Sequence, residues 1–474
     1  METSSLIPVP SPEQIMSTLF PNGVIPPVSL NQIWSAQLML TPFGGGKGNA
    51  TVNPSDQLAV AQLTYEQTAS GQLMRVSMYL VESLTYFDFL FSTTTAGSQW
   101  WWLVSDPQDP QALPSATFGP YATSAAVPQF NLLAENGFSN VGTWKIHGEP
   151  CTVFSARRAA AAGTWYCFDE QSDQISRIMN VDSVNDFAVP ILGAYYLVDF
   201  PTVQALSSSN LPQVLALCPS GPSQPGPSAM LTLNDIEQAM AESPAGPQTA
   251  CTPQQLQAII PGLSLPATPP APPAWTDQVS SMCYMIGQDI YPYYCQVWYD
   301  WTAGMQVTVF VQQDANGAYT QRQDMFLPKG VVGPVAVYEW AGTAWAPSCC
   351  QPGGGFVPMP VPDFVQADHG KCRATIANNP YFGTISIWSV QMGDQSQWTD
   401  FWYWFNAQQQ GVVFSLAPAG SLTMIDYQTF VQNGTIPGSY LQNPCGQVPS
   451  CPPSTGAAQA SAQFSPGSRK DRTR

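Results

Sequence analysis

The sequence contains few charged residues. Asp, Glu, Lys and Arg make up 9% of its 474 residues, whereas roughly 25% is usual in soluble globular proteins. Only 14 residues are Lys or Arg against 31 that are Asp or Glu, which gives a net charge of −17. Because proteins bind the phosphate backbone by neutralising it with Lys and Arg, we do not expect a nucleic-acid partner. Uncharged polar side chains must cover most of the surface.

Long apolar runs and familiar motifs are also missing. No segment reaches the roughly 18 consecutive apolar residues of a transmembrane helix. The first 20 residues contain three prolines, two glutamates and no basic region, so they do not form a recognisable secretory signal. The chain has no Gly-x-Ser-x-Gly elbow, no phosphate-binding glycine loop and no His-Glu-x-x-His, and we expect neither a metal nor a cofactor.

Four short patterns recur in the same order in residues 75–218 and in residues 322–445. The matched pairs are Arg75-x-x-x-Tyr79-Leu80 with Arg322-x-x-x-Phe326-Leu327, His147-Gly148-x-x-Cys151 with His369-Gly370-x-Cys372, Trp165-Tyr166-x-Phe168-Asp169 with Trp402-Tyr403-x-Phe405-Asn406, and Asp199-Phe200-x-Thr202 with Asp426-Tyr427-x-Thr429. A fixed order of uncommon residues at a long period indicates an internal duplication. The length of the chain independently favours two domains.

Most of the chain has the pattern of strands. Short runs rich in β-branched and aromatic residues, several alternating in polarity, lie at 58–66, 73–82, 85–91, 99–104, 305–312, 384–390, 398–405 and 412–416. The run Trp398–Phe405 is almost wholly aromatic, which predicts a strand covered on both faces, with one face against the other module. We therefore predict a mainly β protein of two tandem curved antiparallel sheets, or half-barrels, with a few short helices.

Helix starts and proline-rich composition divide the chain. Ser11 and Thr252 each precede a proline and stand three residues before a glutamine, as in capped helices, and a third helix is predicted from Thr232. The predicted domains are a first β module at 1–218, a proline-rich linker with short helices at 219–274, a second β module at 275–452 and a disordered tail at 453–474. We expect the two modules to pack on each other.

Eleven cysteines with few lysines indicate an oxidising compartment. Sequons at Asn49 and Asn433 predict glycosylation there, so we expect an extracellular or extracytoplasmic location although the chain shows no leader. If duplicated positions keep a duplicated bond, the disulfides are Cys151–Cys218 and Cys372–Cys445, with Cys283–Cys295 as a further pair. Free thiols in a cytosolic protein are the alternative, and an odd count leaves at least one cysteine unpaired.

The two histidines, His147 and His369, each stand close before a cysteine. Zinc binding there would require the disulfides to be absent and further ligands to be found. Catalysis would require a partner group within hydrogen-bond reach. We therefore favour a structural histidine at a turn before a strand, because a feature kept in both copies is more simply explained as architecture.

Scarce cations and abundant aromatics supply the candidate ligand contacts. Arg75 and Arg322 lie in predicted strands, where each either pairs with Asp169, Asp199 or Asp426 or anchors a ligand carboxylate. Trp and Tyr offer large contact areas with polar tips, and the aromatic clusters are either core or the lining of a site. The predicted ligand-binding residues are Arg75, Arg322, Trp34, Trp102, Trp298 and Trp402.

The strand-rich order, an arginine in an early strand and the segment from Asp426-Tyr427 to Cys445 resemble the LolA-like and ependymin-related superfamily of curved β half-barrels. That resemblance implies a sheet wrapped partly round a helix or plug, leaving a hydrophobic cup for acyl chains or similar ligands. Ependymin-related members also pair two such modules. The chain departs from them in its missing signal and in having little that would form a calcium site.

These observations lead to one favoured function and two alternatives. The favoured function is a non-enzymatic binding protein with a hydrophobic cup in each module, whose partner is a lipid-like or aromatic small molecule. The first alternative is a cofactor-independent enzyme of secondary metabolism that acts on an aromatic substrate. The second is a secreted structural or surface-interaction protein without a pocket, which fully packed aromatics would favour.

Overall fold

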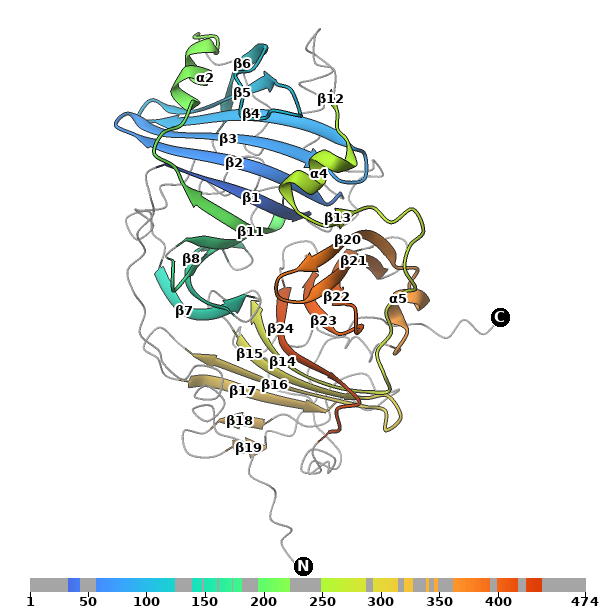
Figure 1. Ribbon diagram of the computed structural model, residues 1–474. Helices are drawn as coiled ribbons and strands as arrows, with labels where there is room; N and C mark the ends of the chain where they lie inside the picture. The colour runs from blue at the N-terminus through green and yellow to red at the C-terminus, as the bar shows by residue number, and fades with distance from the viewer. Residues whose placement is uncertain are drawn as a thin grey trace, which may run out of the picture.

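The computed structural model describes residues 33–42, 57–123, 139–146, 149–159, 162–172, 174–180, 195–221, 249–286, 293–313, 319–326, 338–340, 345–347, 361–392, 399–416 and 423–436. Two large sheets occupy most of this part of the chain (Figure 1). All strand pairs in them are antiparallel, and the helices are short. The predicted mainly β fold of two sheets is confirmed.

The first sheet has 12 strands and the second has 10. The first comprises β1 (Ile33–Pro42), β2 (Ala59–Thr68), β3 (Gly71–Leu80), β4 (Thr85–Thr94), β5 (Gly97–Val104), β6 (Ala116–Thr123), β7 (Ser139–Ile146), β8 (Glu149–Ala159), β9 (Ala162–Asp169), β10 (Ile175–Asn180), β11 (Tyr195–Ala205) and β12 (Thr249–Ala250). The second comprises β13 (Leu263–Ser264), β14 (Gln278–Ile286), β15 (Tyr293–Asp300), β16 (Met305–Gln313), β17 (Tyr319–Phe326), β20 (Lys371–Asn379), β21 (Gly383–Met392), β22 (Thr399–Asn406), β23 (Gly411–Leu416) and β24 (Thr423–Gln432). A small separate sheet pairs β18 (Tyr338–Trp340) with β19 (Trp345–Pro347).

The strand orders show the duplication directly. The first sheet runs β4-β3-β2-β1-β11-β10-β9-β8-β7, and the second runs β17-β16-β15-β14-β24-β23-β22-β21-β20. Both orders therefore place the first strand of a module beside its last strand. A register irregularity also recurs at this pairing, opposite Thr202 in β11 and Thr429 in β24. The two sheets have one topology, with β5, β6 and β12 added to the first and β13 to the second.

Register separates the true sequence matches from the false ones. Trp165 and Trp402 lie in equivalent strands, β9 and β22, and Asp199 and Asp426 in equivalent strands, β11 and β24. Arg75, however, lies in the third strand of its sheet and Arg322 in the fourth.

The cysteine match fails in the same way. Cys151 lies in β8, whereas Cys372 lies in β20, the equivalent of β7. Two of the four predicted matches are therefore wrong, because short patterns of strand residues recur by chance in a strand-rich chain.

The helices are α2 (Leu211–Leu217), α4 (Pro253–Ile259) and α5 (Phe364–Ala367). The capping box predicted at Thr252 is present, since its hydroxyl accepts from the N–H of Gln255 and the Gln255 side chain accepts from the N–H of Thr252. Helix α2 was not predicted, and its N-cap Asn210 makes no side-chain cap hydrogen bond. The helices predicted at Ser11 and Thr232 lie outside the described residues.

The predicted linker contributes to both sheets. Strand β12 pairs with β4, and β13 pairs with β20, so residues 249–264 bridge the two modules. Helix α4, between them, buries Leu256 and Ile259. The module boundaries at residues 218 and 275 stay predictions.

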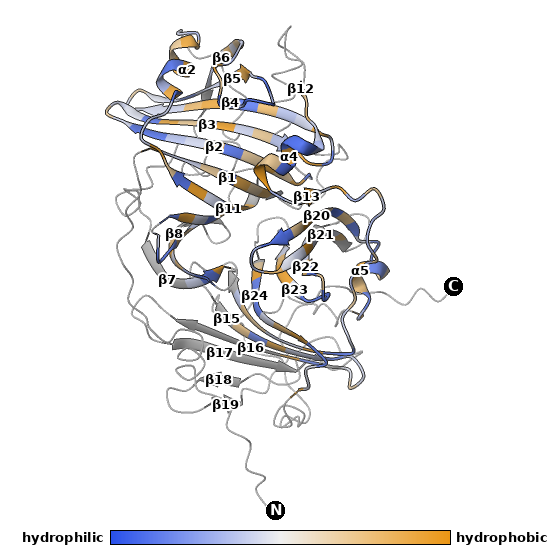
Figure 2. Ribbon diagram, in the orientation of Figure 1, coloured by the Kyte–Doolittle hydropathy of each residue, from blue (hydrophilic) through white to orange (hydrophobic). Residues whose placement is uncertain are grey.

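The two sheets share one core, which we call the junction core. It contains buried residues of both sheets and of α4, among them Met39, Trp144, Trp165, Leu256, Tyr284, Ile387, Trp402, Trp404 and Met424. Apolar and polar residues interchange along the strands (Figure 2), and successive side chains of a strand point to opposite faces of its sheet. In β22, Trp402 and Trp404 enter the junction core while Tyr403 and Phe405 enter a cluster on the other face. This confirms that the aromatic strand is covered on both faces and meets the other module.

Candidate functional site

The first sheet carries a continuous apolar cluster on the side opposite the junction core, which we call the far face. Its buried members are Trp34, Ala36, Leu38, Leu40, Ala59, Ala61, Leu63, Tyr65, Met74, Val76, Met78, Leu80, Phe87, Phe89, Phe91, Trp100, Trp102, Tyr166, Phe168, Ile175, Ile178, Val198 and Phe200. Aromatic rings pack closely within it, with centroid distances of 5.3 Å for Trp34 and Tyr65 and 4.4 Å for Trp100 and Tyr121. No charged side chain belongs to this cluster.

The second sheet has an equivalent cluster. Register places Cys283 at the position of Leu38, and Cys295 at that of Ala61. The cluster of the second sheet contains these two cysteines together with Phe364, Val365, Trp388, Val390, Tyr403, Phe405, Phe414 and Ile425. Phe364 and Val365 come from α5, so a short helix packs on this face. The same face is therefore apolar in both modules.

The structure separates the four predicted ligand-binding tryptophans. Trp34 and Trp102 lie in the far face. Trp298 and Trp402 lie in the junction core, where they pack with residues of both modules. All four are buried, the most exposed being Trp298 at 8%. Only Trp34 and Trp102 stay candidates for contact with a ligand on the far face.

Arg75 makes a buried ion pair with Asp88, which was not among its predicted partners. Its Nη2 lies 2.7 Å from Asp88 Oδ2, and both side chains are at most 1% exposed. Nη2 also donates to the Ser105 hydroxyl, and Nη1 donates to the Ala112 carbonyl. These bonds give Arg75 a structural role, one of the two alternatives from the sequence. The side chain of Arg322 lies outside the described residues.

A second buried ion cluster joins the two modules. Arg177 of β10 donates from Nε to Asp199 Oδ1 of β11 at 2.6 Å, and from Nη1 to Asp426 Oδ2 of β24. Trp144 Nε1 donates to the same Asp426 oxygen at 2.8 Å. Arg177 is 0% exposed, and the two aspartates are 5% and 1% exposed. We call these four residues the junction cluster.

The two aspartates of the junction cluster are the repeated aspartates of the sequence patterns. The sequence offered them as partners of Arg75 or Arg322, and both instead bind Arg177. Arg177 pairs with Asp199 in the strand register, while the equivalent partner of Asp426 is Val413. Only one module supplies a cation, so the sequence pattern could indicate the aspartates but not the arginine that joins them.

Burial raises the pKa of Asp199 above its ordinary value of 3.8, and the nearby Arg177 opposes this rise. A raised pKa in the folded state means that folding favours the protonated carboxyl. The resulting stabilisation is complete below pH 3.8 and is lost as the pH rises through the folded-state pKa.

We therefore expect the free energy of unfolding of the parent chain to fall as the pH rises from about 3.8. We expect Asp199→Asn to remove this fall. Urea unfolding at several pH values measures this. The matched control is Asp169→Asn, because Asp169 is partly exposed at the end of β9, where it accepts hydrogen bonds from Gln171 and Ser172. An unchanged pH dependence in Asp199→Asn would contradict the prediction.

A third contact between the modules lies nearer the surface. Glu82 pairs with Lys371 at 2.8 Å and with Arg373 at 2.6 Å. Arg373 also donates to the Ser389 hydroxyl and lies 5.5 Å from the centre of the Trp402 ring. Because Lys371 is 62% exposed, its ion pair with Glu82 adds little to the stability of the fold. Arg373 lies over a buried indole and adds more.

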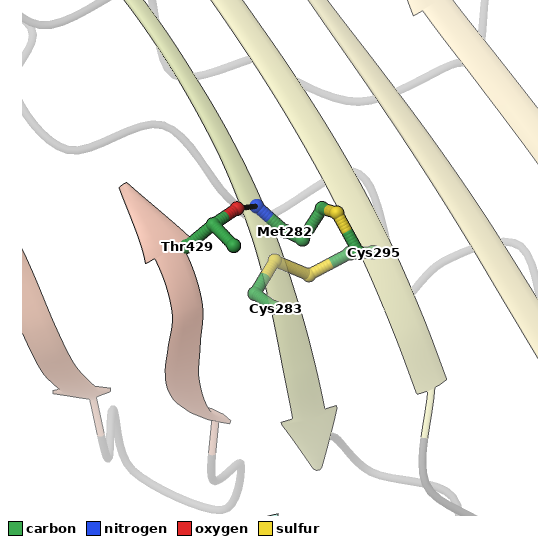
Figure 3. The surroundings of a disulfide bond; sticks show 4 residues. All are labelled: Met282, Cys283, Cys295 and Thr429. Atoms are coloured by element: carbon green, nitrogen blue, oxygen red, sulfur yellow. Dashed lines mark hydrogen bonds between the residues drawn. A yellow bond between two sulfur atoms is a disulfide. The ribbon is translucent and has the colours of Figure 1, made fainter. Parts of the chain in front are cut away.

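The cysteines pair differently from the prediction based on the duplication. The structure joins Cys283 to Cys295 across β14 and β15 (Figure 3), as predicted from the sequence. Beside it, Thr429 accepts a hydrogen bond from the N–H of Met282. Cys151 and Cys218 are free thiols, so the predicted bond between them is wrong. Their positions explain this, because Cys151 lies in the junction core while Cys218 packs beside α2.

The remaining predicted cysteines, the histidines and the glycosylation sites have the following positions. Cys372 is a free thiol, which does not fit its predicted bond, and Cys445 lies outside the described residues. His369 is exposed at a turn directly before β20, with φ of 55°, as the structural interpretation expected. His147 and Asn49 lie outside the described residues, whereas Asn433 is exposed after β24. Glycosylation stays a prediction.

The described residues contain no group of three or more His, Cys, Asp or Glu side chains placed to hold a metal ion. Within the same ranges, no helix has the length and hydrophobicity needed to cross a membrane.

Comparison with known proteins gives distant structural matches only. No family model and no curated protein matches the sequence. A complex of MucA and MucB from Pseudomonas aeruginosa aligns with 9% identity over 85% of this chain and 95% of the other, with a TM-score of 0.21. A LolA superfamily protein from Nitrosomonas europaea aligns with 10% identity over 36% of this chain and 91% of its own, with a TM-score of 0.16. Kievitone hydratase from Nectria haematococca aligns with 8% identity over 85% and 90%, with a TM-score of 0.15.

Proposed function

We propose that this protein is a binding protein that holds a lipid-like or aromatic ligand against the far face of its first module. The segregation of charge between the two faces of the first sheet carries this proposal. Arg75, Asp88, Arg177 and Asp199 are buried on the side opposite the far face or at the junction, whereas β1–β5 place no charged side chain on the far face. A neutral face rich in aromatics favours an uncharged ligand, because burying a charge there without a partner is costly.

The ligand contacts in this proposal are Trp34 and Trp102 together with the Phe and Met residues beside them. Phe89 packs beside the tryptophans of β5, with ring centroids 6.0 Å from Trp100 and 6.4 Å from Trp102. The Trp100 indole N–H has no hydrogen-bond partner among the described residues. It could therefore donate to one polar group of an otherwise apolar ligand.

We further propose an extracytoplasmic location. The Cys283–Cys295 disulfide supports it, because such bonds persist mainly in oxidising compartments.

Titration with the neutral fluorescent probe N-phenyl-1-naphthylamine tests the binding function. We expect saturable binding that Ala61→Phe weakens at least about tenfold, because Ala61 is buried in the far face and an added ring displaces the side chains that the probe would contact. Ala374→Phe is the matched control, since Ala374 is equally buried but lies in the junction core. We expect the control to keep the affinity of the parent chain.

Two results would contradict the proposal. One is the absence of any saturable binding by the parent chain. The other is an equal loss of affinity in both variants, which would place the effect in general destabilisation. Unfolding curves of both variants identify such a loss, because each inserts the same ring into a packed site.

A further inference from the structure

Two cysteines of the junction core lie together on neighbouring strands. In the register of β8 and β9, Cys151 faces Asp169 and Val153 faces Cys167, so the cysteines are diagonal neighbours two positions apart. Both belong to the junction core, so both side chains project from the same face of the sheet. Their exposures are 1% and 0%. Register and shared face therefore bring these two thiols together.

The two thiols also influence each other, because Cys167 is among the groups that raise the pKa of Cys151. Diagonal cross-strand neighbours lie about 7–8 Å apart, with their Cβ atoms somewhat closer. A small local movement of β8 and β9 is therefore needed to bring the sulfurs to the about 2.05 Å of a disulfide. This pair of cysteines occurs only in the first module, since register places Ile385 and Trp404 at the equivalent positions of the second. Conversely, the first module has Leu38 and Ala61 at the positions where the second module has the disulfide-bonded Cys283 and Cys295.

We propose that Cys151 and Cys167 form a reversible disulfide in the wall of the first module that faces the second. The oxidant is a small-molecule or protein disulfide. One protein thiolate attacks a sulfur of the oxidant, giving a mixed disulfide and one released thiol. The second protein thiolate then displaces the other half. The chain loses two electrons and two protons, which appear in the two thiols formed from the oxidant.

The surroundings of the pair determine when it reacts. Burial raises the pKa of the Cys151 thiol well above its ordinary value, although the nearby Arg177 opposes this rise. Because the thiolate is the reactive form, exchange is slow while the junction core is closed. Local separation of the modules hydrates the thiols and admits the oxidant. Cys218 is only half-buried, although burial raises the pKa of its thiol to about 11.

The test uses the full chain, incubated with mixtures of oxidised and reduced glutathione in a low, sub-denaturing concentration of urea. After acid quenching, free thiols are blocked with iodoacetamide in denaturant, and the digest is mapped by mass spectrometry. We expect one cross-linked product that joins the peptides of Cys151 and Cys167, forming faster as the urea concentration rises. Reduction should return both thiols.

Two variants control the assignment. Cys167→Val should abolish the product and leave Cys151 as a free thiol or a glutathione adduct. Cys251→Val should leave the product intact, because Cys251 is another buried cysteine of the junction core.

If Cys167→Val fails to fold, the peptide map of the parent chain still decides. The Cys283–Cys295 disulfide shows that conditions are oxidising. If Cys151 and Cys167 are both recovered as alkylated thiols under conditions in which that disulfide is intact, the proposal is wrong. A link from Cys151 to Cys218 would also overturn it. Probe binding at the far face is a separate measurement, so the two proposals can fail independently.

Discussion

Arg177→Met is expected to lower the free energy of unfolding by about 3–5 kcal/mol, because it leaves two buried carboxyl groups without their cation. Asp199 and Asp426 are 5% and 1% exposed, so water cannot replace the arginine. Urea unfolding followed by circular dichroism at pH 7 measures the change. The matched control is Arg373→Met, where the partner Glu82 is 20% exposed and where we expect a loss of only about 1–2 kcal/mol.

A triple variant without the three charges shows whether Arg177→Met loses stability through unpaired charge or through lost packing. Arg177→Met combined with Asp199→Leu and Asp426→Asn removes all three charges, and the new amide oxygen keeps an acceptor for Trp144 Nε1. We expect this triple variant to recover most of the lost stability, since buried ion clusters are often replaced by apolar groups at little cost. If Arg177→Met cost no more than Arg373→Met, or if the triple variant were no better than the single one, the assigned role of the junction cluster would be wrong.

Arg75→Met should have an effect of similar size within the first module. Asp88 is 0% exposed, and without Arg75 the side-chain donor left to it among the described residues is the Ser77 hydroxyl at 3.0 Å. We expect a loss of about 3–5 kcal/mol in the free energy of unfolding. A double-mutant cycle with Asp88→Leu should give a coupling energy of at least about 2 kcal/mol, because each single variant strands a buried charge.

The same variant tests the alternative role of Arg75 as an anchor for a ligand carboxylate. Arg75 projects from the side of β3 opposite to Met74 and Val76, which belong to the far face. Folded Arg75→Met should therefore bind N-phenyl-1-naphthylamine and a long-chain fatty acid as the parent chain does. Strictly additive losses in the cycle would contradict the ion-pair assignment, and a selective loss of fatty-acid affinity would restore the anchor role.

Eight of the 24 described strands could be placed from the sequence, because alternation and β-branched residues are local signals; the eight are β2, β3, β4, β5, β16, β21, β22 and β23. The run Trp398–Phe405 also indicated its burial on both faces, since the five consecutive aromatic residues Phe401–Phe405 leave no polar side. Helix α4 was predictable from Thr252 and Gln255. Helix α2 has no capping box, and its start signals, Asn210 at the N-cap and Pro212 in the first turn, were missed.

The pairing of residues across the sheets was much less predictable. The match of Arg75 with Arg322 and that of Cys151 with Cys372 looked as good in sequence as the match of Asp199 with Asp426. Only strand register distinguishes them, because a pattern of three or four residues does not fix which strand carries it. The partner of Arg75 is Asp88, on the adjacent strand β4, and its identity depended on the register of β3 with β4.

The junction cluster has a consequence for how the two modules are related. In a symmetric pair of identical subunits, every side chain near the twofold axis occurs twice, so two aspartates there would come with two arginines or with none. Here the aspartates are equivalent, but Arg177 stands opposite Val413 in the other copy. One cation shared by two equivalent anions can be encoded only when both copies belong to one chain. Their fusion therefore allowed an asymmetric contact that a homodimer cannot build, and it makes the two halves no longer interchangeable.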